Sequence, residues 1–196
     1  MVENYTPEEQ TILLKIVRTT LETATAGQAT PLPDLQTLPE ALREPRACFV
    51  TLHTRDGELR GCTGTLTARR PLAHEVSYIA IQTAFHDPRF APLRADELPD
   101  IQIEISVLTP PVELPFTTPE EIPRLLRPHI DGVILAIGSR RATFLPQVWE
   151  RAPDPEEFLD LLCHKMGLPA RAWLLQGVKV YIYQAIVIQE QPAVAG

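Results

Sequence analysis

Hydrophobic residues recur every three or four positions in three stretches of the chain, a spacing that predicts amphipathic helices. The first stretch follows Thr6-Pro7-Glu8-Glu9, where a threonine cap, a proline at the first helical position and a glutamate three residues after the cap mark a helix start. This pattern predicts a helix over residues 6–27. The same spacing predicts a second helix over residues 71–85 and a third over residues 154–167.

Alternating apolar and polar residues predict strands in the remaining chain. Residues 46–54 and 59–65 flank Asp56-Gly57, a strong hairpin signal, and we expect them to pair with Thr54 opposite Leu59. Further strands are predicted at Ile101–Leu108, in a second hairpin that joins Gly132–Gly138 to Ala142–Leu145 across Ser139-Arg140, and in one long strand over Val178–Gln189.

Helices and strands are interspersed, and hairpins replace regular strand–helix–strand repeats. This order predicts an α+β fold with a largely antiparallel sheet and flanking helices. At 196 residues the chain is long enough for one compact domain, which could divide into two lobes. We therefore expect a single domain over residues 1–196, with an N-terminal helix at 6–27 and a main body at 46–190.

The stretch Leu59–Thr65 carries two glycines and a cysteine, which is costly in a strand because glycine offers no side chain to pack. A strand of this kind usually passes close to another group or re-aims a side chain. In the expected register His53 lies opposite Arg60 and Thr51 lies opposite Cys62, and these four side chains share one face of the hairpin. A thiol, a guanidinium and an imidazole are thus predicted on one surface.

Two roles are open for Cys62. A cationic neighbour such as Arg60 or protonated His53 would favour the thiolate, which is the nucleophilic form of cysteine. Alternatively, Cys62 is a small packed residue, since free cysteine is commonly buried. Cys48 is expected on the opposite, core-facing side of the hairpin and Cys163 on a helix, and both are interpreted as structural.

Four other residues could belong to a site. Glu104, on the polar side of a predicted strand, could pair with Arg60, act as a general base, or simply face solvent. Arg89, within Asp87-Pro88-Arg89-Phe90, could bind an anion over a cleft, or belong to a turn that ends the second helix. Gly61 and Gly64 are candidates for ligand binding, because glycine allows a close approach to the backbone.

Composition argues against several classes of function. The formal net charge is −7, from 18 basic and 25 acidic residues, and there is no long basic run, so nucleic-acid binding is disfavoured. Neither H-E-x-x-H nor C-x-x-C occurs, and we predict no metal site and no cofactor.

The chain also lacks the sequence marks of export and membrane insertion. No apolar run approaches the ~18 residues of a membrane span. Residues 1–5 lack a signal-peptide profile. The three cysteines form no close pair, so a reduced, cytoplasmic protein without disulfides is expected.

The segments LRGCTGTL, AFHDPRFAPL, IEISVLTPP and ATFLPQVWE resemble the AMMECR-type domain, called AmmeMemoRadiSam system protein A in microbes. The resemblance runs from about Phe49 to Trp173, and one of its motifs centres on Cys62. The family name implies a pathway shared with a Memo-type protein and a radical S-adenosylmethionine protein. This chain lacks the cysteine triad that would hold an iron–sulfur cluster, so such a cluster would belong to a partner.

Two hypotheses about function follow. In the first, the chain is an accessory protein that binds a ligand or partner in a cleft around the LRGCTGT strand. In the second, it is an enzyme that uses Cys62 as the nucleophile in acyl or similar group transfer on a small metabolite, with support from Arg60, His53 and Glu104. The resemblance itself implies no particular reaction.

Overall fold

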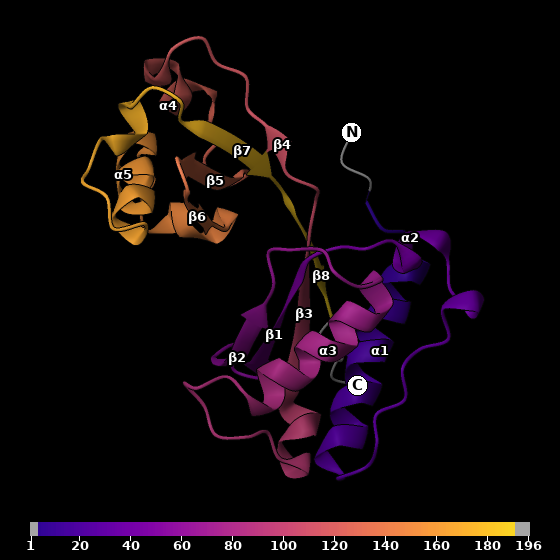
Figure 1. Cartoon of the computed structure of the whole chain (residues 1–196). Helices are drawn as coiled ribbons and strands as arrows, with labels where there is room; N and C mark the ends of the chain where they lie inside the picture. Colours follow the sequence, from indigo (N-terminus) through magenta and orange to yellow (C-terminus); the bar gives the residue numbers. More distant parts are fainter. Residues whose placement is uncertain (1–3, 191–196) are drawn as a thin grey trace. The chain divides into compact units, whose positions relative to one another are not determined.

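The first helix begins where its capping signature predicts. In α1 (Pro7–Thr25), the hydroxyl of Thr6 accepts from the N–H of Glu9, and the Glu9 carboxylate accepts from the N–H of Thr6 at 2.8 Å. Gly27 follows the helix with a φ of +68°, a conformation that glycine adopts without strain. The computed structural model describes residues 4–190 (Figure 1).

The chain divides into two units. The first is made by the chain up to Leu108 and again from Ile186, and the second by Thr109–Ala185. Each unit has its own four-stranded sheet and its own hydrophobic core. The predicted fold class is therefore confirmed, with two sheets in place of the one expected and with units that correspond to two lobes.

In the first unit the strands follow the order β2-β1-β3-β8. Their bounds are β1 (Cys48–Thr54), β2 (Leu59–Gly64), β3 (Ile101–Leu108) and β8 (Ala185–Gln189). The helices are α1, α2 (Glu40–Arg43) and α3 (Leu72–Phe85), and 3₁₀ helices lie at Leu35–Thr37 and Ala95–Asp100. Alternate residues of β1 and β3, such as Val50 and Ile105, pack with Val17 of α1 and Val76 of α3 in one core. The two long helices therefore lie side by side against one face of the sheet (Figure 1).

The register of the first hairpin differs from the prediction by one residue at its closed end. Thr51 lies opposite Cys62, as predicted, but His53 lies opposite Leu59, so the expected pairs of Thr54 with Leu59 and of His53 with Arg60 are wrong. Arg60 is the extra residue of a bulge. The turn explains the shift, because the N–H of Thr54 donates to the carbonyl of Glu58 at 2.8 Å, which closes the loop one residue earlier.

In the second unit the strands follow the order β4-β7-β5-β6. Their bounds are β4 (Val112–Glu113), β5 (Gly132–Ile137), β6 (Arg140–Phe144) and β7 (Lys179–Tyr183). The helices are α4 (Ile122–Leu125) and α5 (Pro155–Lys165), with 3₁₀ helices at Pro119–Glu121, Pro146–Glu150 and Ala172–Leu174. The turn between β5 and β6 is Gly138-Ser139, one residue before the predicted position, and Gly138 has a φ of +60°.

The predicted long strand over Val178–Gln189 is broken. Its first half is β7 of the second unit and its second half is β8 of the first, so the single strand was a wrong prediction. At the break, Gln184 forms two hydrogen bonds with Thr109: its carbonyl accepts from the Thr109 N–H and its N–H donates to the Thr109 hydroxyl, at 2.9 and 2.8 Å. These contacts replace ladder pairing at the point where the chain passes from one unit to the other.

Two further observations concern the helices. In α5, Phe158, Leu159 and Leu162 are buried, whereas Leu161 is 37% exposed. Within residues 4–190, no helix combines the length and the apolar character needed to cross a membrane.

Candidate functional site

A row of polar side chains crosses the first sheet on the face opposite to α1 and α3. Thr51 lies between Cys62 of β2 and Glu104 of β3, its direct neighbours in the two adjoining strands. The Thr51 hydroxyl donates to the Cys62 Sγ at 3.2 Å, and the side chain of Gln189 in β8 donates to the Glu104 carboxylate. We call Cys62, Thr51, Glu104 and Gln189 the polar row. It spans all four strands, because alternate residues point to the same face.

His53 lies on the same face of β1 as Thr51, two residues along the strand. Its cross-strand neighbours are Gln102 in β3 and Leu59 in β2. His53 and Cys62 therefore share the predicted face of the hairpin. Arg60, as the bulge residue, is not paired with His53.

The turn after α3 is fastened to the backbone of Cys62 by an aspartate and an arginine. The N–H of Cys62 donates to the Asp87 carboxylate at 2.9 Å, and the Arg89 guanidinium donates to the Cys62 carbonyl at 2.9 Å. Arg89 also donates to both carboxylate oxygens of Asp87, at 2.9 and 2.7 Å. We call these contacts the Asp87–Arg89 latch. Because β2 is an edge strand, the latch occupies backbone groups that another strand could otherwise pair with.

Asp87 is only 4% exposed, yet its surroundings stabilise the charged form. The hydrogen bonds from Arg89 lower the pKa of the Asp87 carboxyl, burial opposes them, and the N–H of Cys62 lowers the pKa further. The anion that Arg89 binds in this structure is thus the chain's own aspartate. Of the two roles left open for Arg89, the turn that ends the helix is the one that these contacts describe.

Arg60 and Glu104, which the sequence suggested as a pair, have different partners. The Arg60 guanidinium donates to both carboxylate oxygens of Glu97 at 2.8 and 3.1 Å and to the carbonyl of Ala91 at 3.0 Å. Glu104 accepts from Gln189 instead. Of the three roles left open for Glu104, pairing with Arg60 is therefore not the one that these contacts describe. As the bulge residue, Arg60 holds the segment after α3 against β2, a bidentate contact that also lowers the pKa of Glu97.

The two glycines of the motif sit where a side chain would collide with a neighbour. A Cβ at Gly64 would lie 2.3 Å from the ring of Phe49, its cross-strand partner. A Cβ at Gly61 would lie 3.0 Å from the carbonyl of Thr83 in α3. Contact with the Phe49 ring therefore accounts for Gly64, and contact with α3 accounts for Gly61.

Sequence reasoning placed Thr51 opposite Cys62 without giving it a role in the site, and it missed Asp87 and Glu97. Thr51 is the polar residue opposite Cys62, and its register position was available from the hairpin pattern. Asp87 and Glu97 act across 25 and 37 positions of sequence, and only the fold brings them to β2. The charged residues of the HDPRF segment, residues 86–90, indicated a turn after the second helix. They did not indicate the strand that this turn contacts.

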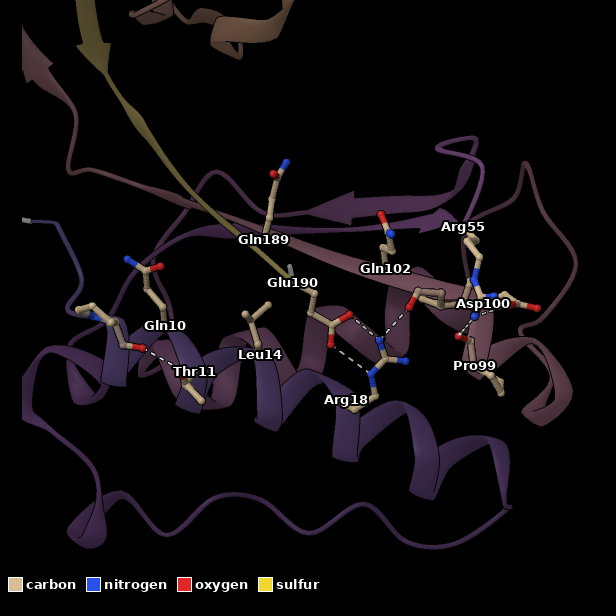
Figure 2. Close-up of a pocket in the computed structure, with 12 residues that line it drawn as sticks. Gln10, Thr11, Leu14, Arg18, Arg55, Pro99, Asp100, Gln102, Gln189 and Glu190 are labelled. Atoms are coloured by element: carbon tan, nitrogen blue, oxygen red, sulfur yellow. Dashed lines mark hydrogen bonds and ion pairs between the residues drawn. The ribbon is translucent and has the colours of Figure 1, made fainter. Parts of the chain in front are cut away.

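A cavity of about 520 Å³ lies between α1 and the ends of β3 and β8, as Figure 2 shows. Its charged groups are already engaged: Arg18 donates to Glu190 at 2.5 Å and to the carbonyls of Leu98 and Ile101 at 3.0 and 2.8 Å. Since Arg18 joins α1, β3 and the end of β8, we interpret these contacts as a structural tie. Among the described residues, no group of three histidine, cysteine, aspartate or glutamate side chains is arranged to hold a metal ion.

Comparison with known proteins places the chain among relatives of similar length. A family model, AMMECR1, matches residues 14–188. Protein MJ0810 of Methanocaldococcus jannaschii is 39% identical over 187 residues, which covers 94% of this chain and 92% of the relative. A protein of Methanothermobacter thermautotrophicus is 40% identical over 185 residues, which covers 93% and 95%.

A solved structure agrees with these matches. The crystal structure of the uncharacterized protein PH0010 from Pyrococcus horikoshii aligns with a TM-score of 0.78 at 35% identity, over 94% of this chain and 92% of that one. The family model spans most of the sequence, and the relatives match along nearly their full length. The chain belongs to the AMMECR1 family.

Proposed function

We propose that the chain is an accessory protein that binds a ligand or partner through the polar row, in a pathway shared with a Memo-type protein and a radical S-adenosylmethionine protein. The observation that carries this proposal is the continuity of the row from Cys62 to Gln189. A thiol, a hydroxyl, a carboxylate and an amide lie in sequence across one sheet face. Such a mixture of donors and acceptors on a fixed surface suits specific recognition.

The surroundings of the row favour binding because they hold it rigid. The opposite face of the same strands is packed against two helices, and the Asp87–Arg89 latch fixes the backbone of Cys62. A surface held in place before the ligand arrives loses less entropy on binding. Binding through the polar row would therefore require little rearrangement of its side chains.

The contacts of Cys62 give less support to the enzyme hypothesis. A nucleophilic cysteine is activated by an adjacent cation or base. Here the group that touches the Sγ is the Thr51 hydroxyl, while Arg60 is engaged with Glu97 and Glu104 with Gln189. We therefore place Cys62 in the binding surface and keep the nucleophile as the alternative. The three free thiols are also consistent with the proposed cytoplasmic location.

Native mass spectrometry of the purified chain with a cell-extract metabolite mixture tests this proposal. We expect a bound species that Thr51→Val and Glu104→Gln remove and that Thr19→Val keeps, because Thr19 is an exposed threonine on α1. A species that survives in all variants, or no bound species at all, would count against a small ligand on the row. Sedimentation with the purified Memo-type and radical S-adenosylmethionine proteins then tests whether the chain binds either of these partners.

Alkylation by iodoacetamide separates binding from nucleophilic catalysis. Cys62 is half-buried, so a binding role predicts that it reacts no faster than free glutathione at neutral pH. A rate about tenfold or more above glutathione would favour the enzyme. Cys48 and Cys163 serve as internal controls, since burial raises the pKa of both thiols.

A further inference from the structure

A second concave surface lies beyond the outer edge of β2. A groove of about 340 Å³ is lined by the end of β2, by the loop before α3 and by one stripe of α3 from Glu75 through Tyr78 to His86. The eleven steps from Glu75 to His86, the residue that follows α3, correspond to about 16 Å at 1.5 Å per residue. The groove is therefore elongated along the helix, and its lining contains no residue of the polar row.

The groove is cationic, although the chain as a whole has a net charge of −7. Its lining carries two guanidinium groups, Arg69 and Arg70, and one carboxylate, Glu75. Glu75 is only 1% exposed and accepts from Arg70 at 2.9 Å, so its charge is neutralised from within. Arg69 is exposed, which leaves an excess of positive charge at the mouth of the groove.

The wall formed by β2 also offers backbone groups. At Cys62, the N–H and the carbonyl both point away from β1 and are taken by the latch. Backbone direction alternates along an antiparallel strand, so the N–H and carbonyl of Gly64 point to the same outer side. The N–H of Thr65 points inward and donates to the carbonyl of Cys48 at 3.0 Å. Gly64 thus presents one donor and one acceptor to the groove.

An apolar surface completes the groove. Tyr78 is 44% exposed, and the Arg70 guanidinium stacks on its ring, 4.1 Å from the centroid. This stacking, together with the bond to Glu75, holds Arg70 in one orientation.

We propose that this groove binds an extended, acidic segment of a partner protein. At about 3.3 Å per residue, roughly five residues in extended conformation match the length of the groove. One residue of the segment exchanges backbone hydrogen bonds with Gly64, acidic side chains face Arg69 and Arg70, and an apolar side chain packs on Tyr78. This combination of strand-edge pairing with side-chain pockets is an established way to recognise peptides. The proposal does not depend on the function of the polar row.

An immobilised library of pentapeptides tests it directly. In one half of the library two positions are fixed as Asp or Glu, in the other half the same positions are fixed as Lys or Arg, and the remaining positions are randomised. We expect the full chain to be retained by the acidic half, with binding that weakens as salt is raised. Retention by neither half, or by both halves equally, overturns the proposal.

Variants and competitors then assign the binding to this groove. Arg69→Glu should weaken binding of the strongest acidic pentapeptide by about tenfold or more, because like charges oppose each other. Arg43→Glu, which reverses an exposed arginine on α2, should leave it unchanged. Tyr78→Ala should also weaken it, and circular dichroism verifies the fold of each variant. Equal effects of Arg69→Glu and Arg43→Glu contradict the groove assignment.

A modified peptide and a small anion decide what kind of ligand is recognised. The same pentapeptide with alternate N-methylated amides cannot pair with Gly64 and should lose most of its binding. If that peptide binds as well as the original, or if inorganic phosphate displaces the original at equal concentration, the groove is a small-anion site and the peptide proposal is wrong.

Discussion

The two units stabilise their sheets with different kinds of contact. In the first unit, charged side chains tie loops to β2: Asp87 and Arg89 bind the backbone of Cys62, and Arg60 pairs with Glu97. In the second, aromatic rings pack: Trp149 stacks on Phe158 with centroids 3.7 Å apart, and the rings of Phe144 and Phe158 meet edge-on at 5.5 Å. The second unit also holds an ion pair with a buried carboxylate, Arg127 with Asp131, so the difference lies in its stacked rings and in the charged contacts that the first unit makes to its edge strand β2.

Two buried cysteines allow this comparison to be measured. Cys48 is buried in the core of the first unit and Cys163 in the core of the second. Alkylation of each thiol, followed by mass spectrometry along a urea series, reports the opening of its own unit. Because each unit has its own core, we expect variants of one unit to shift mainly its own cysteine.

The largest effect is expected for Trp149→Ala in the second unit. Trp149 is fully buried and donates to the carbonyl of Asp131 at 2.7 Å, so the change leaves a cavity and an unpaired carbonyl. We predict a loss of about 4 kcal/mol in the free energy of unfolding, independent of salt. Cys163 should become reactive at lower urea while Cys48 keeps its midpoint. A parallel shift of both cysteines would show that the units unfold together.

Asp87→Ala should produce the next largest effect, in the first unit. The change removes a buried carboxylate and leaves both the Cys62 N–H and the Arg89 guanidinium without their partner. Because the Arg89 side chain is 53% exposed and water can solvate it, the main cost is the unpaired Cys62 N–H and the lost charged hydrogen bonds, about 2 kcal/mol in total. Here Cys48 should react earlier and Cys163 should not. Asp96→Ala is the matched control, since Asp96 also pairs with an arginine but is exposed.

A smaller effect is expected from acid. The pKa of Asp87 is lowered in the folded chain, so its contribution to stability is complete above the unfolded value of about 3.9 and is lost as the pH falls below it. The urea midpoint, followed by circular dichroism because protonated thiols are not alkylated at this pH, should therefore decrease below about pH 4. Asp87→Asn should flatten this decrease, since it removes the titrating group. An unchanged decrease in that variant would assign the acid sensitivity to other carboxylates.

The smallest effect on stability is expected for Cys62→Ala. Cys62 is partly exposed, and losing its sulfur should cost no more than about 1 kcal/mol. Ligand or partner binding should fall only as far as the lost contact explains. A loss of function of about a hundredfold with unchanged stability would instead indicate the nucleophile.

Much of the fold could be predicted because it follows from local patterns. The capping box at Thr6, the aspartate cap at Asp154 and the alternation in β3 depend on a few neighbouring residues, and all three are present. The break near Gln184 could not be predicted in this way. The residues of β7 and β8 read as one β-rich run, and only the tertiary structure assigns its halves to different sheets.

The candidate site was predictable in composition but not in its contacts. The hairpin pattern placed Cys62 opposite Thr51 and on the face of His53, and both placements are confirmed. The partner of Arg60 depended on a one-residue bulge, which no alternation rule reveals. A bulge moves charged side chains without changing the apolar pattern that sequence reasoning uses.

The path of the chain between the units has a consequence for its synthesis. The second unit is inserted between Leu108 and Ile186, so a ribosome releases all of it before β8 emerges. At roughly 5–20 residues per second, that interval lasts roughly 4 to 15 seconds. Throughout it, the newly made β3 presents a bare edge that β8 will later cover. Translation rate therefore sets how long a nascent chain is open to mispairing with its neighbours.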